Sequence, residues 1–253
     1  MRILILGGTA EARQLAGALA GQPAFDVTLS LAGRTAAPLA QGVPVRSGGF
    51  GGAEGLADYL RAERIGALID ATHPYAAIMS ANAAKAARAA KVKLLALRRS
   101  PWTQRSGDNW IEVGTVAEAA RAIGEEPSRV FLALGRKELA PFAQAPQHIY
   151  LVRSVDPVEK PLDLPNAAYI SARGPFREAD DLALLQENGI DIVVSKNSGG
   201  DASYSKIAAA RALGLPVIML KRPALPEVTS VERVGEVVAW LDHAIAPATA
   251  RGV

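Results

Sequence analysis

Two short stretches of the chain hold residues whose types and spacing suit the binding of an anion. The first is Gly7-Gly8-Thr9, which follows the apolar run Ile3–Leu6 and precedes a segment of helical composition that begins at Ala10. Glycines allow a tight turn and a close approach to the backbone, Thr9 can cap the helix, and the N–H groups at a helix start attract phosphate. The stretch indicates a nucleotide-binding unit or, because the third glycine of the dinucleotide fingerprint is absent, a tight turn without a ligand.

The second stretch is Lys196–Gly200, with the sequence KNSGG, between a strand predicted at Asp191–Val194 and a helix predicted at Ala202–Leu213. An ammonium group beside amide and hydroxyl side chains and two glycines can bind carboxylate or phosphate. Tyr204 and Lys206 fall in the first turn of the predicted helix. We therefore expect an anion site here, with a plain strand-to-helix loop as the alternative.

Two more loops in the first half of the chain have compositions that suit a nucleotide. Arg34 follows the predicted strand Phe25–Leu31. At that position, dinucleotide-binding sheets carry an acid for the ribose or an arginine for a 2′-phosphate. Arg34 therefore favours NADP over NAD, unless it is a solvated loop residue. The segment Ser47–Gly52 places four glycines around Phe50, which favours a ligand-facing loop over a flexible surface loop.

Candidates for proton transfer lie in Thr72-His73-Pro74-Tyr75, directly after the predicted strand Ala67–Ala71. Open α/β sheets bind ligands at the carboxyl ends of their strands. Pro74 suits the first turn of a helix, so we predict that a helix begins there. His73 and Tyr75 are candidates for a chemical role or a ligand contact, with helix capping or packing as the alternative.

The elements that must position these loops alternate between strand and helix along the chain. This pattern predicts an α/β protein with two Rossmann-like three-layer α/β/α domains, mainly parallel sheets and a ligand cleft between the domains. The predicted strand Val92–Leu97 closes the first sheet. We expect an N-terminal domain at 1–98, an inter-domain segment at 99–125, a C-terminal α/β domain at 126–246 and a tail at 247–253.

Composition excludes several classes of protein. The chain has 253 residues, 49% hydrophobic and 21% charged, with a formal charge of +3. It contains no cysteine, so thiol chemistry and disulfides are excluded, and its three histidines are too scattered to predict a metal site. The sequence has no basic run with interleaved aromatic residues, no apolar stretch long enough to span a membrane and no signal peptide. We expect a cytoplasmic monomer that binds neither nucleic acid nor membrane.

Taken together, these loops resemble the precorrin-6A reductase family of cobalamin biosynthesis over nearly the whole chain. The matching pieces are Gly7-Gly8-Thr9 with Glu11 and Arg13, Gly33-Arg34-Thr35, Arg46–Gly52, Asp70–Ala76, Gly135-Arg136, Arg173–Phe176, and Ser195–Gly200 with Tyr204, Lys206 and Arg222-Pro223. The resemblance implies an NADPH-dependent reductase. It would transfer a hydride to one carbon of precorrin-6A, a tetrapyrrole with many carboxylates, and a proton would complete the dihydro product precorrin-6B.

The resemblance also implies a division of labour among the loops. Implied contacts to the NADPH cofactor are Gly7, Gly8, Thr9, Ala10, Arg13, Arg34, Thr35, Ser47, Gly48, Gly49, Phe50, Thr72, His73 and Pro74. Implied contacts to the substrate are Tyr75, Arg136, Lys137, Arg173, Lys196, Asn197, Ser198, Gly199, Gly200, Tyr204 and Lys206. Tyr75, His73, Lys196 or water would supply the proton.

Three other functions remain open from the sequence. The first is reduction of cobalt-precorrin-6A, as in the anaerobic route. The second is a different NADPH-dependent reductase or epimerase, but the usual Tyr-x-x-x-Lys pair is absent, since Tyr204 and Lys206 are two apart and Met79 lies four residues after Tyr75. The third is a two-lobed anion-binding protein without catalytic activity.

Overall fold

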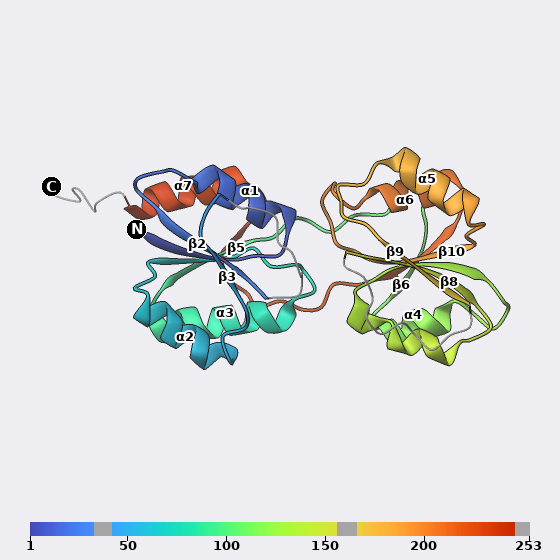
Figure 1. Ribbon diagram of the computed structural model, residues 1–253, viewed down its shortest axis with the longest axis horizontal. Coiled ribbons are helices and arrows are strands. Elements are labelled where there is room, and N and C mark those ends of the chain that lie inside the picture. Colours follow the sequence, from blue (N-terminus) through green and yellow to red (C-terminus); the bar gives the residue numbers. More distant parts are fainter. Residues whose placement is uncertain (33–41, 156–165, 246–253) are drawn as a thin grey trace. The chain divides into compact units, whose positions relative to one another are not determined.

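The protein, described here from a computed structural model, forms two α/β units (Figure 1). Residues 1–32, 42–155 and 166–245 are described. Unit 1 consists of Met1–Ser100 with Ala224–Val253, and unit 2 consists of Pro101–Pro223. Each unit contains a six-stranded sheet in which every strand pair is parallel. The predicted class, two Rossmann-like α/β units, is thereby confirmed.

Unit 1 has the strand order β12-β5-β4-β1-β2-β3. Its elements are β1 (Arg2–Leu6), α1 (Ala10–Leu19), β2 (Asp26–Leu31), β3 (Val45–Ser47), α2 (Gly52–Ala62), β4 (Ala67–Asp70), α3 (Ala77–Ala90), β5 (Lys93–Leu97), β12 (Ser230–Val231) and α7 (Val234–Ile245). The chain starts at the central strand β1, builds outward to β3, and returns to add β4 on the other side. The point between β1 and β4 is therefore the topological switch point, where doubly wound sheets bind their ligands.

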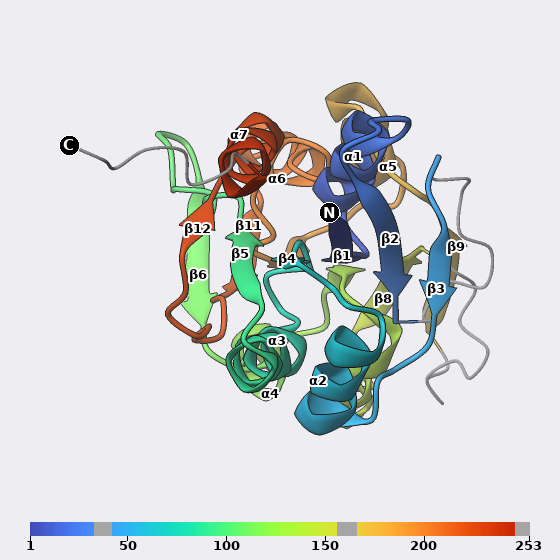
Figure 2. The same ribbon diagram turned by 90° about the vertical axis from the view of Figure 1, so that its left-hand side faces the viewer.

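Alternation along β1 explains why this sheet has helices on both faces. Ile3 and Ile5 belong to one buried cluster with residues of α1 and α7, whereas Leu4 and Leu6 belong to another with residues of α2 and α3. Successive side chains of a strand point to opposite faces, so an unbroken apolar run needs cover on both sides. Figure 2 shows α1 and α7 on one face of the unit 1 sheet and α2 and α3 on the other.

Unit 2 has the strand order β6-β11-β10-β7-β8-β9. Its elements are β6 (Asn109–Val113), α4 (Val116–Ala122), β7 (Arg129–Ala133), the 3-10 helices η1 (Arg136–Glu138) and η2 (Ala140–Gln144), β8 (Ile149–Ser154), β9 (Ala167–Ser171), α5 (Glu178–Glu187), β10 (Ile192–Lys196), α6 (Ser205–Ala212) and β11 (Pro216–Leu220). Helices α5 and α6 cover one face of the sheet, and α4 lies on the other (Figure 1).

Each sheet takes its edge strand from a distant part of the sequence, which changes the expected domain boundaries. Strand β6, within the segment 99–125 that was expected to lie between domains, pairs with β11. Strand β12 and helix α7, expected in the domain 126–246, belong to unit 1, because β12 pairs with β5 and Val237 and Leu241 complete a unit 1 core cluster. The sequence had suggested that β5 closes its sheet. This prediction is wrong, because β12 lies beyond β5 at the edge.

The predicted start of one helix is also corrected. Helix α3 begins at Ala77 rather than Pro74, because Pro74 and Tyr75 form a turn in which Ala76 N donates to His73 O at 2.7 Å. After β7, Gly135 leads into two 3-10 helices. Arg34 and Thr35 lie outside the described residues.

Candidate functional site

The loops at the switch point of unit 1 leave the sheet at the same level. Leu6 pairs with Ser30 on one side and with Asp70 on the other, and Asp70 pairs in turn with Ala96. In parallel strands this register brings the carboxyl ends to one edge of the sheet. The residues that follow β1, β4 and β5 are therefore neighbours, although more than sixty positions separate the end of β1 at Leu6 from the end of β4 at Asp70.

The two glycines of the β1–α1 turn serve different purposes. A Cβ atom on Gly7 would lie 2.6 Å from Leu29 Cδ1, so Gly7 is required by packing against β2, and its N–H donates to Ser30 O at 2.9 Å. Gly8 has a φ of +116°, and a Cβ atom there would meet nothing within 4 Å. Gly8 thus combines a backbone conformation reserved for glycine with open space above it, as a close-approaching ligand requires.

Thr9 ties this turn to the loop after β4. Its Oγ1 donates to Ala71 O at 2.8 Å and accepts from Ala12 N at 3.1 Å, so it caps α1 as the sequence predicted. The other N–H groups of the first helical turn have no partner within the helix and point along the helix axis toward the switch point. Together with the helix dipole they suit a phosphate group.

The loop after β4 is preset by local hydrogen bonds. Asp70 is 3% exposed, and its Oδ1 accepts from Thr72 Oγ1 at 2.7 Å and from Thr72 N at 3.2 Å. His73 Nδ1 accepts from Tyr75 N at 3.3 Å, and the two ring centroids lie 5.7 Å apart. The two candidates for proton transfer are therefore held beside each other in one turn.

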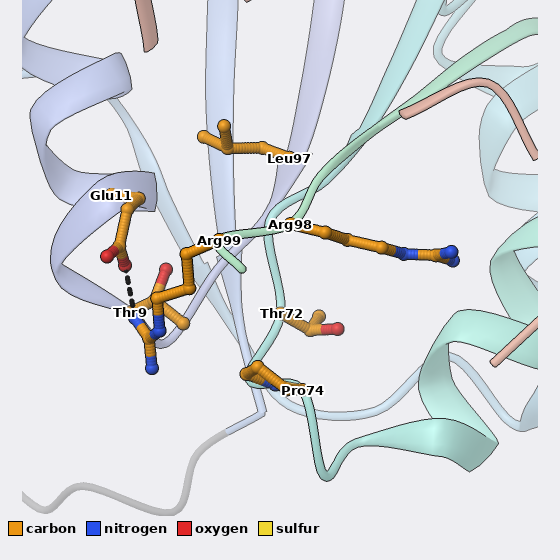
Figure 3. A pocket seen from close by; sticks show the side chains of 7 residues that line it. All are labelled: Thr9, Glu11, Thr72, Pro74, Leu97, Arg98 and Arg99. Atoms are coloured by element: carbon orange, nitrogen blue, oxygen red, sulfur yellow. Dashed lines mark hydrogen bonds and ion pairs between the residues drawn. The ribbon is translucent and has the colours of Figure 1, made fainter. Parts of the chain in front are cut away.

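These loops line a recess at the carboxyl edge of the unit 1 sheet. Its lining residues are Thr9, Glu11, Thr72, Pro74, Leu97, Arg98 and Arg99. Figure 3 shows Arg99 turned toward the start of α1, where its Nη1 lies 2.5 Å from Glu11 Oε2. Both side chains of this ion pair are mostly buried. Three residues predicted from two separate motifs, Thr9 from one and Thr72 and Pro74 from the other, are thus brought together. Glu11, Arg98 and Arg99 had not been predicted to bind the cofactor or substrate.

The glycine loop after β3 is organised by an arginine. Arg46 donates from Nη1 to Gly48 O and from Nη2 to Gly49 O, each at 2.7 Å. Its guanidinium carbon lies 3.8 Å from the centroid of the Phe50 ring, which in turn packs edge-on against Tyr59. The loop that includes Ser47 through Phe50 therefore has a fixed shape at the same edge of the sheet. Arg13, by contrast, is exposed on α1.

In unit 2 the predicted cationic residues also gather at the carboxyl edge of the sheet. Lys196 Nζ, at the end of β10, lies 2.5 Å from Glu138 Oε1, and Glu138 Oε2 accepts from Gly135 N at 2.8 Å. Glu138 thus joins the loops after β7 and β10, which are neighbouring strands. Arg136 follows β7 and Arg173 follows β9, and both are exposed. The contact of Glu138 with Gly135 N could have been predicted, because a glutamate three residues after the first residue of a helical turn often accepts from that N–H.

Besides Lys196, three more of the predicted substrate contacts have partners inside unit 2. Asn197 is buried and pairs with the backbone of Trp102, accepting from Trp102 N at 2.7 Å and donating to Trp102 O at 2.9 Å. Lys206 is 4% exposed, donates to Ser203 O at 2.5 Å and lies 5.0 Å from the Trp102 ring centroid. The Tyr204 hydroxyl accepts from Arg211, whose pKa is raised mainly by its hydrogen bond to Asp108. These side chains shape the Lys196–Gly200 loop from within.

The same loop is held from the next strand by Arg222. This arginine donates from Nε to Asn197 O at 2.9 Å and from Nη2 to Ser198 O at 3.0 Å. Gly199 and Gly200 follow with φ values of +68° and +67°. A bulkier residue at either position would be strained, so the turn is specified by the sequence.

Beneath these loops lies a buried ion pair. Arg153 on β8 donates from Nη1 to Asp181 Oδ1 on α5, and both residues are less than 10% exposed. Asp181 Oδ2 also accepts from Ser205 Oγ at 2.6 Å at the start of α6. The Arg153 guanidinium carbon lies 4.0 Å from the centroid of Phe176 in the loop that carries Arg173. One carboxylate therefore connects three elements under the candidate substrate loops.

Two kinds of feature are absent from the described residues. Across the residues whose placement is described, no group of three or more histidine and acidic side chains is arranged to hold a metal ion. Within the same ranges, no helix has the length and apolar character needed to cross a membrane.

Comparison with known proteins shows close relatives along the full chain. The family model described as Precorrin-6x reductase CbiJ/CobK matches residues 2–242. The chain is 53% identical to a precorrin-6A reductase from Sinorhizobium sp. over 98% of this chain and 95% of that protein. A solved structure described as CobK precorrin-6A reductase matches all of both chains with a TM-score of 0.92 and 50% identity. A cobalt-precorrin-6A reductase from Priestia megaterium is 32% identical over 93% of this chain and 96% of that protein.

Proposed function

The chain belongs to the precorrin-6x reductase family, and we propose that it reduces precorrin-6A with NADPH as the hydride donor. A hydride and a proton add across one double bond of the macrocycle, which gives the dihydro product, precorrin-6B, and NADP⁺. The observation that carries this proposal is the 53% identity, over almost the full length of both chains, to a precorrin-6A reductase. Family membership and the Rossmann-like fold suggest a nicotinamide cofactor in general, and the choice of NADPH is part of the proposal.

We assign the cofactor to unit 1. Bound NADPH supplies the hydride, and the residues of this chain hold it in place. Gly8 lets the backbone approach the pyrophosphate, and the start of α1, where Ala10 lies and which Thr9 caps, offers N–H groups to it. The loop that includes Ser47, Gly48, Gly49 and Phe50 and the loop Thr72-His73-Pro74 lie at the same edge, where the ribose and nicotinamide would extend. Arg34 and Thr35, with Arg13, are proposed to bind the 2′-phosphate.

We assign the macrocycle carboxylates to unit 2. Arg136, Arg173 and Lys196 lie at the carboxyl ends of three strands, and cations placed there suit a polyacid. Lys137, in η1, and Ser198, Gly199 and Gly200 of the loop after β10 complete the proposed surface. Asn197, Tyr204 and Lys206 support it through the internal contacts described above. Tyr75, in unit 1, is also proposed as a substrate contact. In this proposal, the proton that completes the reduction comes from Tyr75, His73, Lys196 or water.

Identity favours the cobalt-free substrate over the cobalt-containing one. The relative named precorrin-6A reductase is 53% identical to this chain, and the relative named cobalt-precorrin-6A reductase is 32% identical. The proposal is tested by incubating the protein with NADPH and either precorrin-6A or cobalt-precorrin-6A. We expect loss of the nicotinamide absorbance together with a change in the macrocycle spectrum for precorrin-6A. Oxidation of NADPH with neither macrocycle altered would contradict the proposed reaction.

The choice of cofactor is tested at Arg34. We expect the parent protein to bind NADPH at least about tenfold more tightly than NADH, a difference of about 1.4 kcal/mol. Arg34→Ala should remove most of that difference by weakening NADPH alone, because the two cofactors differ only in the 2′-phosphate. Arg2→Ala, at the amino end of β1, is the control that removes one cation elsewhere in the unit. Equal affinities of the parent protein for both cofactors would refute the role of Arg34.

A further inference from the structure

Arg98 lines the recess of unit 1 but has no role in the assignments above. It follows the last residue of β5, and its backbone N–H donates to Val231 O at 2.8 Å. One side-chain nitrogen, Nη1, donates to Pro226 O at 3.0 Å. The returning segment of the chain thus fixes both the backbone of Arg98 and one corner of its guanidinium group.

The opposite edge of this guanidinium is buried without a hydrogen-bond partner. Both Nε and Nη2 of Arg98 are inaccessible and unpartnered, and none of the carboxylates among the described residues forms an ion pair with it. Arginine stays charged at any ordinary pH, and buried donors without acceptors are rare because they cost free energy. Nε and Nη2 form the two-donor edge of the guanidinium that binds carboxylate or phosphate in bidentate fashion.

Within the described part of the chain, the neighbouring arginine, Arg99, differs from Arg98 in having a carboxylate partner. Arg99 has its charge balanced within the chain by Glu11, 2.5 Å away. Figure 3 shows Arg98 extending in the other direction, on the side toward which the Thr72 side chain points. The two residues line the same recess, yet the carboxylate at the start of α1 pairs with Arg99 and not with Arg98.

We propose that Arg98 binds an oxyanion of a ligand seated in this recess through its Nε and Nη2 atoms. This assignment rests on the proposed function, which supplies two sources of the same chemistry, a carboxylate of the tetrapyrrole and a phosphate of the cofactor. The bond to Pro226 O holds one corner of the guanidinium in place, so only the groups that cover Nε and Nη2 have to move for the oxyanion to reach them. Partial fixation of this kind increases affinity because less side-chain entropy is lost on binding.

The test compares three variants of the full chain. Arg98→Met removes the charge and both donors, and Arg98→Lys keeps the charge without the two-donor edge. Arg2→Met is the matched control, since Arg2 lies in the same unit at the amino end of β1 and also donates from Nη1 to a backbone oxygen, Glu63 O, at 3.0 Å. The measurements are the NADPH dissociation constant, the KM for precorrin-6A, and the thermal unfolding midpoint without ligand.

We expect Arg98→Met to weaken one ligand at least about tenfold, with Arg98→Lys recovering only part of the loss and Arg2→Met unchanged. A raised KM for precorrin-6A identifies a carboxylate as the oxyanion, and a raised NADPH dissociation constant identifies a phosphate. The unfolding midpoint of the ligand-free Arg98→Met protein should stay level or rise, because the replacement removes unpaired buried donors. A residue with a purely structural role would lower the midpoint.

Two results would overturn the assignment. One is that neither constant changes more in Arg98→Met than in Arg2→Met. The other is that the midpoint falls while both constants hold. Failure of the proposed function would appear separately, as a parent protein that does not reduce precorrin-6A. In that case the NADPH titration decides alone, and an unchanged NADPH constant in Arg98→Met would reject Arg98 as a ligand residue.

Discussion

The two units share one strand order but differ after the central strand. Position by position, β12-β5-β4-β1-β2-β3 corresponds to β6-β11-β10-β7-β8-β9. In unit 1 the central strand leads through two glycines into a capped α-helix, whereas in unit 2 it leads through Gly135 into 3-10 helices. The N-terminus of an α-helix presents aligned N–H groups, and these groups bind phosphate. After the central strand, the same sheet order therefore presents a capped α-helix start, which suits a phosphate, in unit 1 and a set of charged side chains in unit 2.

The units also share a device that shapes their glycine loops. In unit 1 Arg46 donates to two successive carbonyl oxygens after β3, and in unit 2 Arg222 does the same after β10. An arginine fork satisfies two backbone acceptors at once, which a glycine loop cannot do for itself. The comparison shows that loop shape is controlled alike in both units, although the residues displayed by the loops differ.

What lies beneath the loops separates the units most clearly. The loops after β1 and β4 are joined by the uncharged contact between Thr9 and Ala71. In unit 2, the start of α6 and strand β8 are joined through Asp181 to the buried guanidinium of Arg153. Buried ion pairs add little net stability compared with apolar residues, but loss of one partner is costly. Unit 2 should therefore be the unit that is more sensitive to a single charge deletion.

The largest effect is expected from Arg153→Met, which leaves Asp181 buried without its cation. We expect the free energy of unfolding to fall by about 3–5 kcal/mol. Arg99→Met, which breaks the pair with Glu11 in unit 1, should cost less, because both side chains of that pair keep more contact with water than Arg153 and Asp181 do. Urea unfolding followed by circular dichroism measures both.

The double replacement Arg153→Met with Asp181→Leu is the control for this prediction. It removes both charges and should recover most of the lost stability, because an apolar pair can replace a buried ion pair. A single replacement Arg153→Met that costs no more than Arg99→Met would contradict the proposed difference between the units.

A smaller effect is expected when the two turn glycines are compared. Gly8→Val places a β-branched residue at a φ of +116° and fills the space above the turn. We expect NADPH to bind at least about tenfold more weakly. Gly135→Ala, at a φ of −76°, should leave NADPH affinity within about twofold of the parent. Isothermal titration with NADPH distinguishes the two, and an equal loss in both variants would place the cofactor outside the β1–α1 turn.

The parts of the site that the sequence revealed are those in which one residue type has one physical use. Gly7 and Gly8 sit after an apolar run, and Thr9 caps the helix as predicted. Parallel strands bring such loops to one edge, so Thr72 and Pro74 could be placed near Thr9 without a structure. The two Rossmann-like units could be predicted for the same reason, since alternation of strands and helices is local.

The parts that escaped prediction depend on pairing between distant segments. The local sequence of β12 does not indicate that this strand pairs with β5 rather than with the strands that precede it in the chain. A strand of two residues is also too short to show a hydrophobic pattern. The contact between Arg99 and Glu11 spans 88 positions. Asn197 and Lys206 looked like ligand residues because their types fit, yet their partners at Trp102 lie about a hundred residues earlier. Side-chain type suggests chemistry, but only packing decides which partner is used.

The smallest expected effect concerns pH and again separates the units. His148 precedes β8 in unit 2, is 1% exposed, and accepts from Ser128 N at 3.2 Å. Burial disfavours the charged ring and lowers its pKa below 6.5. Below pH 6.5 the unfolded chain therefore binds a proton that the folded chain does not. The contribution of His148 to stability is complete above pH 6.5 and is lost as the pH falls toward the folded pKa.

We expect His148→Asn, which keeps an acceptor for Ser128 N, to reduce the slope of unfolding free energy against pH at pH values below 6.5. One proton can account for at most about 1.4 kcal/mol per pH unit. His243→Asn, at an exposed position on α7 in unit 1, is the matched control and should leave the slope unchanged. A Trp240→Phe background leaves Trp102 and Trp110 as fluorescence probes of unit 2. If His243→Asn reduced the slope of unfolding free energy against pH and His148→Asn did not, the prediction would be wrong. The acid-sensitive group would then lie in unit 1.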